Sequence, residues 1–234
     1  MELIKEAAKF NIEITPTQEE NLAKYEKMML EYNEFMNLTA ITDHEEVQEK
    51  HFLDSITLIS SGKLFEGCSL IDIGAGAGFP SIPVKIARED INLTMLDSLN
   101  KRINFLNDVI EKVGLKNAKA LHFRAEEGGK DKNLREKFDI ATARAVADLA
   151  VLSEYALPFV KVGGYFVAMK GNDPEEEINN AKKAIKEMGG QIEEVKELSL
   201  PSGIKHCLVI IKKIEKTPSK YPRKAGKPSK EPIM

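Results

Sequence analysis

Three glycines spaced two apart follow a short, mainly apolar run near residue 70, and this turn constrains the fold more than any other part of the chain. The run is residues 70–73 and the glycines are Gly74, Gly76 and Gly78. Glycine permits positive φ and lets a ligand lie against bare backbone, and Pro80 suits a helix start, where its missing N–H would be unpaired anyway. The pattern predicts a strand, a tight turn and a helix start that together form a cofactor cradle.

The glycine spacing bears on which cofactor the turn would hold. The dinucleotide fingerprint needs a third glycine three positions after the second, and Phe79 stands there. Gly-x-Gly-x-Gly, preceded by Asp72 and followed by Asp97 at the end of the next apolar run, resembles motif I of the class I S-adenosylmethionine (SAM) methyltransferases. A carboxylate at Asp97 can accept hydrogen bonds from both ribose hydroxyls. The alternative is an ordinary Gly-rich turn without a ligand.

Length and composition set the outer bounds. A chain of 234 residues favours one α/β domain with at most an appendage. The two cysteines, Cys68 and Cys207, and an acidic N-terminus without an apolar signal-peptide core predict a reducing, cytoplasmic location. No apolar run approaches the roughly 18 residues of a membrane-spanning helix, so we expect no membrane span.

The pattern of apolar residues divides the chain into three parts. Residues 1–62 show helical spacing and helix-capping signals, and we interpret them as an N-terminal helical extension. Residues 63–212 alternate strands and helices, which is typical of a mostly parallel, doubly wound sheet and here of a SAM-dependent methyltransferase domain. Residues 213–234 form a basic C-terminal tail. We expect seven strands, the last one antiparallel, near residues 68–73, 91–97, 118–123, 138–143, 163–169, 191–198 and 206–212, and four helices between them, near residues 80–88, 98–113, 146–157 and 174–188.

The charge is unevenly distributed. The net charge of the whole chain is −3, yet residues 212–234 carry eight Lys or Arg against two Glu, which leaves −9 on the rest. A cluster of cations with Pro and Gly is typical either of a solvated tail or of a segment that contacts a polyanion. Both interpretations stay open.

Five cations directly follow predicted strands. Ligands of open α/β sheets bind beyond the carboxyl ends of the strands, so we expect these side chains to gather at one edge and to bind the phosphates of a nucleic acid there. They are Lys101, Arg102, Arg124, Arg144 and Lys170.

Several separated blocks of sequence, in order, resemble the RsmG family, also called glucose-inhibited division protein B. The resemblance runs from about residue 20 to the C-terminus. The blocks are Asn37-Leu38-Thr39-Ala40-Ile41, His51-Phe52-Leu53-Asp54-Ser55, residues 71–80 with the glycine turn, residues 96–102 with Asp97, Ala125-Glu126, Arg144-Ala145 and Tyr221-Pro222-Arg223-Lys224-Ala225-Gly226. Ser81 departs from the pattern, since the family more usually has Gly there.

The resemblance implies an enzyme that methylates N7 of one guanine, position 527 in the 530 loop, of bacterial 16S rRNA. The partner would be free 16S rRNA or the 30S subunit, and we expect a monomer without an obligate protein partner. The implied cofactor positions are Gly74, Phe79, Ala125, Glu126 and Arg144, to which the fold argument adds Gly76 and Asp97. Candidate phosphate contacts, offered as the catalytic set, are Arg124, Arg144 and Lys170, with Arg223 and Lys224 in the tail.

Other chemistries find less support. Residues 141–144 lack the Asn/Asp-Pro-Pro-aromatic motif of exocyclic amine methyltransferases, and neither cysteine stands in a Pro-Cys pair that would serve pyrimidine carbon-5 methylation. The two cysteines and His206 also make no metal-ligand pattern. Two rivals remain: a methyltransferase for a small molecule or a protein, and a binding module without catalysis. His51 and Asp54 share a helix face and are expected to pin the extension to the sheet or, alternatively, to face the RNA.

Overall fold

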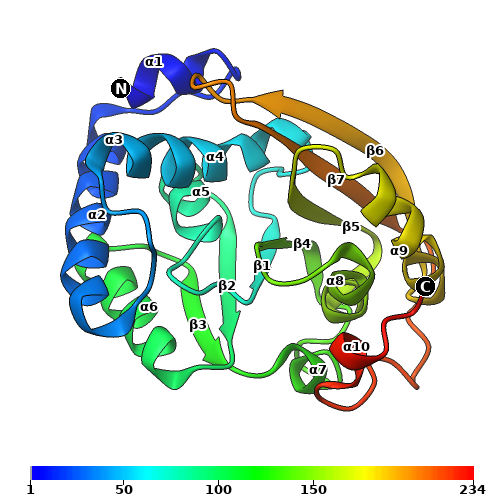
Figure 1. Cartoon of the computed structure of the whole chain (residues 1–234). Coiled ribbons are helices and arrows are strands. Elements are labelled where there is room, and N and C mark those ends of the chain that lie inside the picture. Colours follow the sequence, from blue (N-terminus) through cyan, green and yellow to red (C-terminus); the bar gives the residue numbers. More distant parts are fainter. Residues whose placement is uncertain (1) are drawn as a thin grey trace.

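The computed structural model describes residues 2–234 and has a seven-stranded sheet with helices on both faces (Figure 1). The strand order is β3-β2-β1-β4-β5-β7-β6. Strand β7 pairs antiparallel with β5 and β6, whereas the other neighbouring strands are parallel. The expected sheet, with its antiparallel last strand, is confirmed. The strands are β1 (Ser69–Ile73), β2 (Asn92–Asp97), β3 (Ala118–His122), β4 (Phe138–Arg144), β5 (Val160–Gly171), β6 (Gly190–Ser199) and β7 (Lys205–Lys213).

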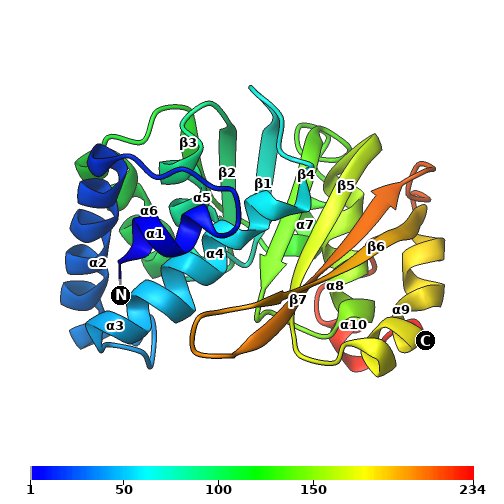
Figure 2. The same cartoon turned by 90° about the horizontal axis from the view of Figure 1, so that it is seen from above.

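The helices pack against the sheet in two layers, each with its own apolar core. Successive strand residues point to opposite faces, so Leu70 of β1 packs in one core and Ile71 in the other. One layer contains α1 (Leu3–Ala8), α2 (Pro16–Met36), α5 (Ser81–Ala87) and α6 (Asn100–Val113), and the other α8 (Leu149–Ala156), η3 (Leu157–Phe159) and α9 (Glu175–Glu187). Figure 2 shows the sheet between these layers. The short helices α7 (Ala125–Gly128) and α10 (Lys227–Lys230) were not expected.

The N-terminal helices share a core with the sheet and contact the glycine turn directly. Helix α2 begins with a capping box formed by Thr15 and Gln18, and its buried Tyr25 stacks on Phe52 at 5.6 Å between ring centroids. The Tyr25 hydroxyl donates a hydrogen bond to the carbonyl of Ala77 at 2.5 Å. The extension therefore supports the turn from one side.

The last helix of the expected N-terminal extension changes its winding along its length. It passes from α3 (His44–Glu46) through the π-helical η1 (Val47–Leu53) and α4 (Asp54–Ile56) to the 3₁₀-helical η2 (Thr57–Ser61). Asp43 caps its start by accepting from the Glu46 N–H. Gly62 ends it in the left-handed conformation that glycine commonly adopts at helix ends.

The C-terminal tail is folded onto the domain, so its interpretation as a solvated tail is wrong. Tyr221 is buried, and the Arg135 guanidinium donates to the backbone carbonyls of Thr217 and Tyr221 at 2.7 and 2.8 Å. The segment has little apolar periodicity of its own and folds because the domain supplies partners for its backbone. Lys216, Lys224 and Lys230 remain exposed, so a polyanion contact stays open.

Replacing Gly78 by Ala should destabilise the turn more than an equivalent change elsewhere. Gly78 has φ +99°, and a Cβ there would lie 2.3 Å from Cδ1 of Ile82 and 3.1 Å from the Tyr25 hydroxyl. Gly203 also has positive φ, +85°, but a Cβ there meets nothing within 4 Å. We expect Gly78→Ala to lower the free energy of unfolding by about 2–4 kcal/mol and Gly203→Ala by about 1 kcal/mol in urea titrations. Equal losses would contradict the packing assigned to Gly78.

Candidate cofactor pocket and its surroundings

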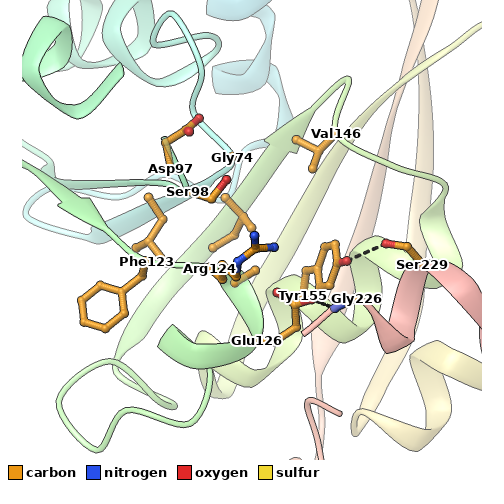
Figure 3. A pocket seen from close by; sticks show the side chains of 13 residues that line it. Gly74, Asp97, Ser98, Phe123, Arg124, Glu126, Val146, Tyr155, Gly226 and Ser229 are labelled. Carbon is orange, nitrogen blue, oxygen red and sulfur yellow. Dashed lines mark hydrogen bonds between the residues drawn. The ribbon is translucent and has the colours of Figure 1, made fainter. Parts of the chain in front are cut away.

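A pocket opens at the point where the sheet changes its direction of winding. Strands β1 and β4 are neighbours, but the helices that follow them, α5 and α8, pack in opposite layers. Such a switch point leaves a crevice beyond the carboxyl ends of the strands. The loops after the first four strands line the pocket (Figure 3), together with the tail; the lining residues are Ile73, Gly74, Leu96, Asp97, Ser98, Phe123, Arg124, Ala125, Glu126, Val146, Tyr155, Gly226 and Ser229.

The glycine turn is held by the end of the neighbouring strand. The backbone N–H groups of Gly74 and Ala75 both donate to the Leu96 carbonyl at 2.9 Å, and the Gly76 N–H donates to Oδ2 of Asp97 at 2.9 Å. Gly74 has φ +74°, and a Cβ there would lie 2.9 Å from Cγ2 of Val146. A side chain at Gly74 would thus collide with the loop after β4, which explains why the turn needs glycine.

Asp97, which the sequence predicts to bind the ribose hydroxyls, lies in the pocket. Its side chain lines the pocket although the residue is only 3% exposed. Oδ1 accepts the Leu99 N–H at 2.8 Å, and Oδ2 faces Arg102 at 3.3 Å. These contacts orient the carboxylate before any ligand arrives.

Ala125 and Glu126 form another wall of the same pocket. Both begin the short helix α7 directly after β3. Oε1 of Glu126 accepts the backbone N–H of Gly226 at 2.8 Å. A residue from the tail therefore fixes the position of a carboxylate in the pocket.

Asp72 has an unpaired oxygen beneath the turn. Oδ2 accepts from the Ser81 hydroxyl at 2.5 Å, so the residue that departs from the family pattern has a hydrogen-bonding role. Oδ1 is buried and has no hydrogen-bond partner among residues 2–234. Burial raises the pKa of Asp72 from 3.8 to about 7.

The pocket fits the nucleoside part of SAM. Carboxylates at Asp97 and Glu126 match hydroxyl and amino donors, while Ile73, Leu96 and Val146 provide an apolar lining for a base. Gly74 lets the backbone approach the ligand closely.

Arg144 and Phe79 belong to a different cluster and do not line this pocket. Arg144 donates to Oδ2 of Asp54 at 2.5 Å, to the Lys50 carbonyl at 3.1 Å, and contacts Nδ1 of His51 at 3.2 Å. Its guanidinium carbon lies 4.9 Å from the centroid of the Phe79 ring, on which His51 stacks. His51 is buried, so the expectation that His51 and Asp54 pin the extension to the sheet is confirmed.

Four of the five cations expected to form one phosphate-binding edge have partners within the protein. Lys170 pairs with Glu177 at 2.5 Å, Lys101 donates to the Met36 carbonyl at 3.3 Å, and Arg144 pairs with Asp54. Arg102 faces Asp97. Of the five side chains, only that of Arg124 has no hydrogen-bond or ion-pair partner within the described chain, and Figure 3 shows its guanidinium in the pocket.

Sequence reasoning missed the pocket residues that come from α8, from the loop after β4 and from the tail. Tyr155 and Val146 lie in residues 146–157, for which the sequence predicts only a helix. Gly226 stands at the end of the Tyr221–Gly226 block of the resemblance, which was the available signal. Arg223, expected to contact phosphate, instead pairs with Glu154.

No helix in residues 2–234 is long and apolar enough to cross a membrane.

Comparisons with known proteins agree on one family. The family model described as rRNA small subunit methyltransferase G matches residues 18–208. Ribosomal RNA small subunit methyltransferase G of Clostridium botulinum (strain Eklund 17B / Type B) is 51% identical over 232 residues, which cover 99% of this chain and 97% of the relative. The protein of that name from Alkaliphilus oremlandii (strain OhILAs) is 53% identical over 234 residues, covering 99% and 98%.

Solved structures show the same fold at low identity. A SAM-dependent methyltransferase from Aquifex aeolicus matches with a TM-score of 0.52 and 19% identity over 72% of this chain and 93% of its own. Precorrin-6y C5,15-methyltransferase from Geobacter metallireducens matches with a TM-score of 0.51 and 18% identity over 74% and 90%. The fold is therefore that of the class I SAM-dependent methyltransferases, as the sequence predicts.

Asp72→Asn should stabilise the protein in a pH-dependent way. The native state holds the Asp72 proton up to about pH 7, while the unfolded chain releases it near the ordinary value of 3.8. The stability from this group is thus fully present below about pH 4 and is lost as the pH rises through 7. Asn does not ionise, so its advantage over the wild type should grow between these limits, on the order of 3 kcal/mol.

Urea unfolding of both proteins between pH 4 and 8 measures this difference, in which the other titrating groups cancel. A difference that is independent of pH would show that Asp72 ionises normally in the folded protein.

Proposed function

The chain belongs to the rRNA small subunit methyltransferase G family, and from that premise we propose that it transfers the methyl group of SAM to N7 of guanine 527 in bacterial 16S rRNA. The observation that carries this proposal is the pocket at the switch point, where oriented carboxylates of Asp97 and Glu126 face a turn of bare backbone at Gly74. When bound, SAM supplies an electrophilic methyl group on a sulfonium.

In the proposed site, Asp97 accepts hydrogen bonds from the ribose hydroxyls. Ala125 and Glu126 contact the base. By the resemblance, Phe79 and Arg144 also belong to the cofactor site. They contact each other beyond the far end of the glycine turn, so the proposal places an elongated cofactor along this turn, with Asp97 near one end and Phe79 near the other.

The reaction needs positioning more than proton transfer. N7 of guanine carries a lone pair and no proton, so no side chain has to act as a general base. The chain's task is to align N7 with the methyl group and to keep water out, and positioning of this kind contributes about 7–11 kcal/mol to lowering a bimolecular barrier.

We propose that the phosphates of the RNA are bound by cationic side chains that have no acidic partner in the described part of the chain. Arg124 is exposed and unpaired among residues 2–234, and Lys224 in the tail is exposed. Single-stranded RNA loops are the usual targets of sequence-specific recognition, because their bases can be turned outward. We further propose that the protein acts as a monomer in the cytoplasm, on 16S rRNA or on the 30S subunit.

The direct test incubates the protein with labelled SAM and 30S subunits or 16S rRNA that lack the modification, and then maps the labelled nucleotide. We expect label at N7 of guanine 527. Asp97→Asn should raise the Kd for S-adenosylhomocysteine about 10–100-fold, because a charged acceptor is lost, and should reduce labelling accordingly. Binding of the cofactor without transfer to rRNA would favour a different methyl acceptor or a non-catalytic module.

Arg124→Gln should weaken binding of the rRNA substrate and lower the slope of log K against log salt by about 1. The control is Lys116→Gln, which also removes one positive charge. Lys116 precedes β3, at the amino ends of the strands and away from the pocket, so neither the affinity for rRNA nor the salt slope should change. A loss of S-adenosylhomocysteine affinity without a change in the salt slope would assign Arg124 to the cofactor instead of the RNA.

A further inference from the structure

The C-terminal segment Tyr221–Ser229 forms one side of the candidate cofactor pocket. Gly226 and Ser229 line it, although they stand 100 and 103 positions after Glu126 in the chain. Figure 3 shows both residues beside Tyr155 and Glu126. One wall of the pocket therefore comes from a segment that follows the last strand of the sheet.

Two hydrogen bonds join this wall to residues of the pocket. The Gly226 N–H donates to Oε1 of Glu126 at 2.8 Å, and the hydroxyls of Tyr155 and Ser229 lie 2.7 Å apart. A carboxylate that is already held loses less side-chain freedom when it accepts a hydrogen bond from a ligand. The tail thus preorganises Glu126.

A buried ion pair fastens the segment to α8. Glu154 is 1% exposed in a helix whose other buried side chains are mainly apolar. Its carboxylate accepts from Nη2 of Arg223 at 2.6 Å, from Nε at 3.0 Å and from the backbone N–H of Arg223 at 2.7 Å. Removing one member of such a pair leaves a buried charge uncompensated, which strongly disfavours the bound arrangement of the tail.

We infer that Arg223 and Glu154 are positioning residues for the cofactor: their ion pair holds the segment Tyr221–Ser229 against the pocket and so sets the affinity for the nucleoside end of SAM. This inference rests on the proposed function. It also gives the basic tail a role that does not depend on contact with RNA.

Arg223→Gln tests the inference in the full-length protein, by cofactor binding without RNA and by kinetics with rRNA. Titration calorimetry should show the Kd for S-adenosylhomocysteine raised about tenfold or more, and the KM for SAM should rise while kcat with rRNA changes little. Lys216→Gln is the charge-matched control, because Lys216 lies in the same tail, is exposed and has no ion-pair partner among residues 2–234. Its Kd should stay within about twofold of the wild type. An unchanged Kd in Arg223→Gln, or equal changes in both variants, would overturn the inference.

Hydrogen exchange of the wild-type protein provides a second test that does not depend on how Arg223→Gln folds. S-adenosylhomocysteine should slow amide exchange about tenfold both at residues 74–78 and at residues 221–229. Protection of the glycine turn alone would overturn the inference and leave the proposed function intact. Protection of both segments in a protein that does not methylate rRNA would support the inference and contradict the proposed acceptor.

Discussion

The carboxylate of Asp97 connects the parts of this structure that make the pocket. It accepts the Gly76 N–H of the turn after β1, the Leu99 N–H at the start of α6, and faces Arg102. Because β1 and β2 are adjacent and parallel, an acid at the end of β2 can bind the backbone of the turn after β1, next to the bonds that the Leu96 carbonyl accepts from Gly74 and Ala75. The same acid is placed to accept the ribose hydroxyls, so the ligand would meet a carboxylate that is already oriented. Preorganisation of this kind reduces the free energy lost on binding.

Two distant segments complete the site from opposite sides. The N-terminal extension contacts the glycine turn through Tyr25 and places Asp54 and His51 on Arg144. The C-terminal segment reaches the other side through Gly226 and Arg223. Each contact uses a charged or polar group that would be costly to leave unpaired in the interior. The termini therefore do more than flank the sheet, since both supply contacts on which the geometry of the central turn depends.

The sequence predicted the parts of the fold that are encoded locally. The strands could be found because short apolar runs alternate with helical patterns along the chain, and Asp97 because it closes the apolar run that follows the glycine turn. Glu126 was expected only from the family resemblance. The ion pairs of Arg144 and Lys170 were not foreseen. Both residues lie at the carboxyl ends of their strands, Arg144 as the last residue of β4 and Lys170 next to the last of β5. Their partners Asp54 and Glu177 lie on other elements, and a pattern along one strand does not show them. The folded position of the tail could not be predicted either, because it depends on contacts with Glu154 and Glu126, which lie far away in the sequence.

A crystal structure with S-adenosylhomocysteine tests the central claim most directly, namely that the turn after β1 and the carboxylate after β2 together hold the cofactor. The account predicts ribose density within hydrogen-bonding distance of Asp97 and the base between Ala125 and the apolar wall that includes Val146. Clear density for the ligand elsewhere, with Asp97 bonded only to Gly76, Leu99 and Arg102, would contradict it.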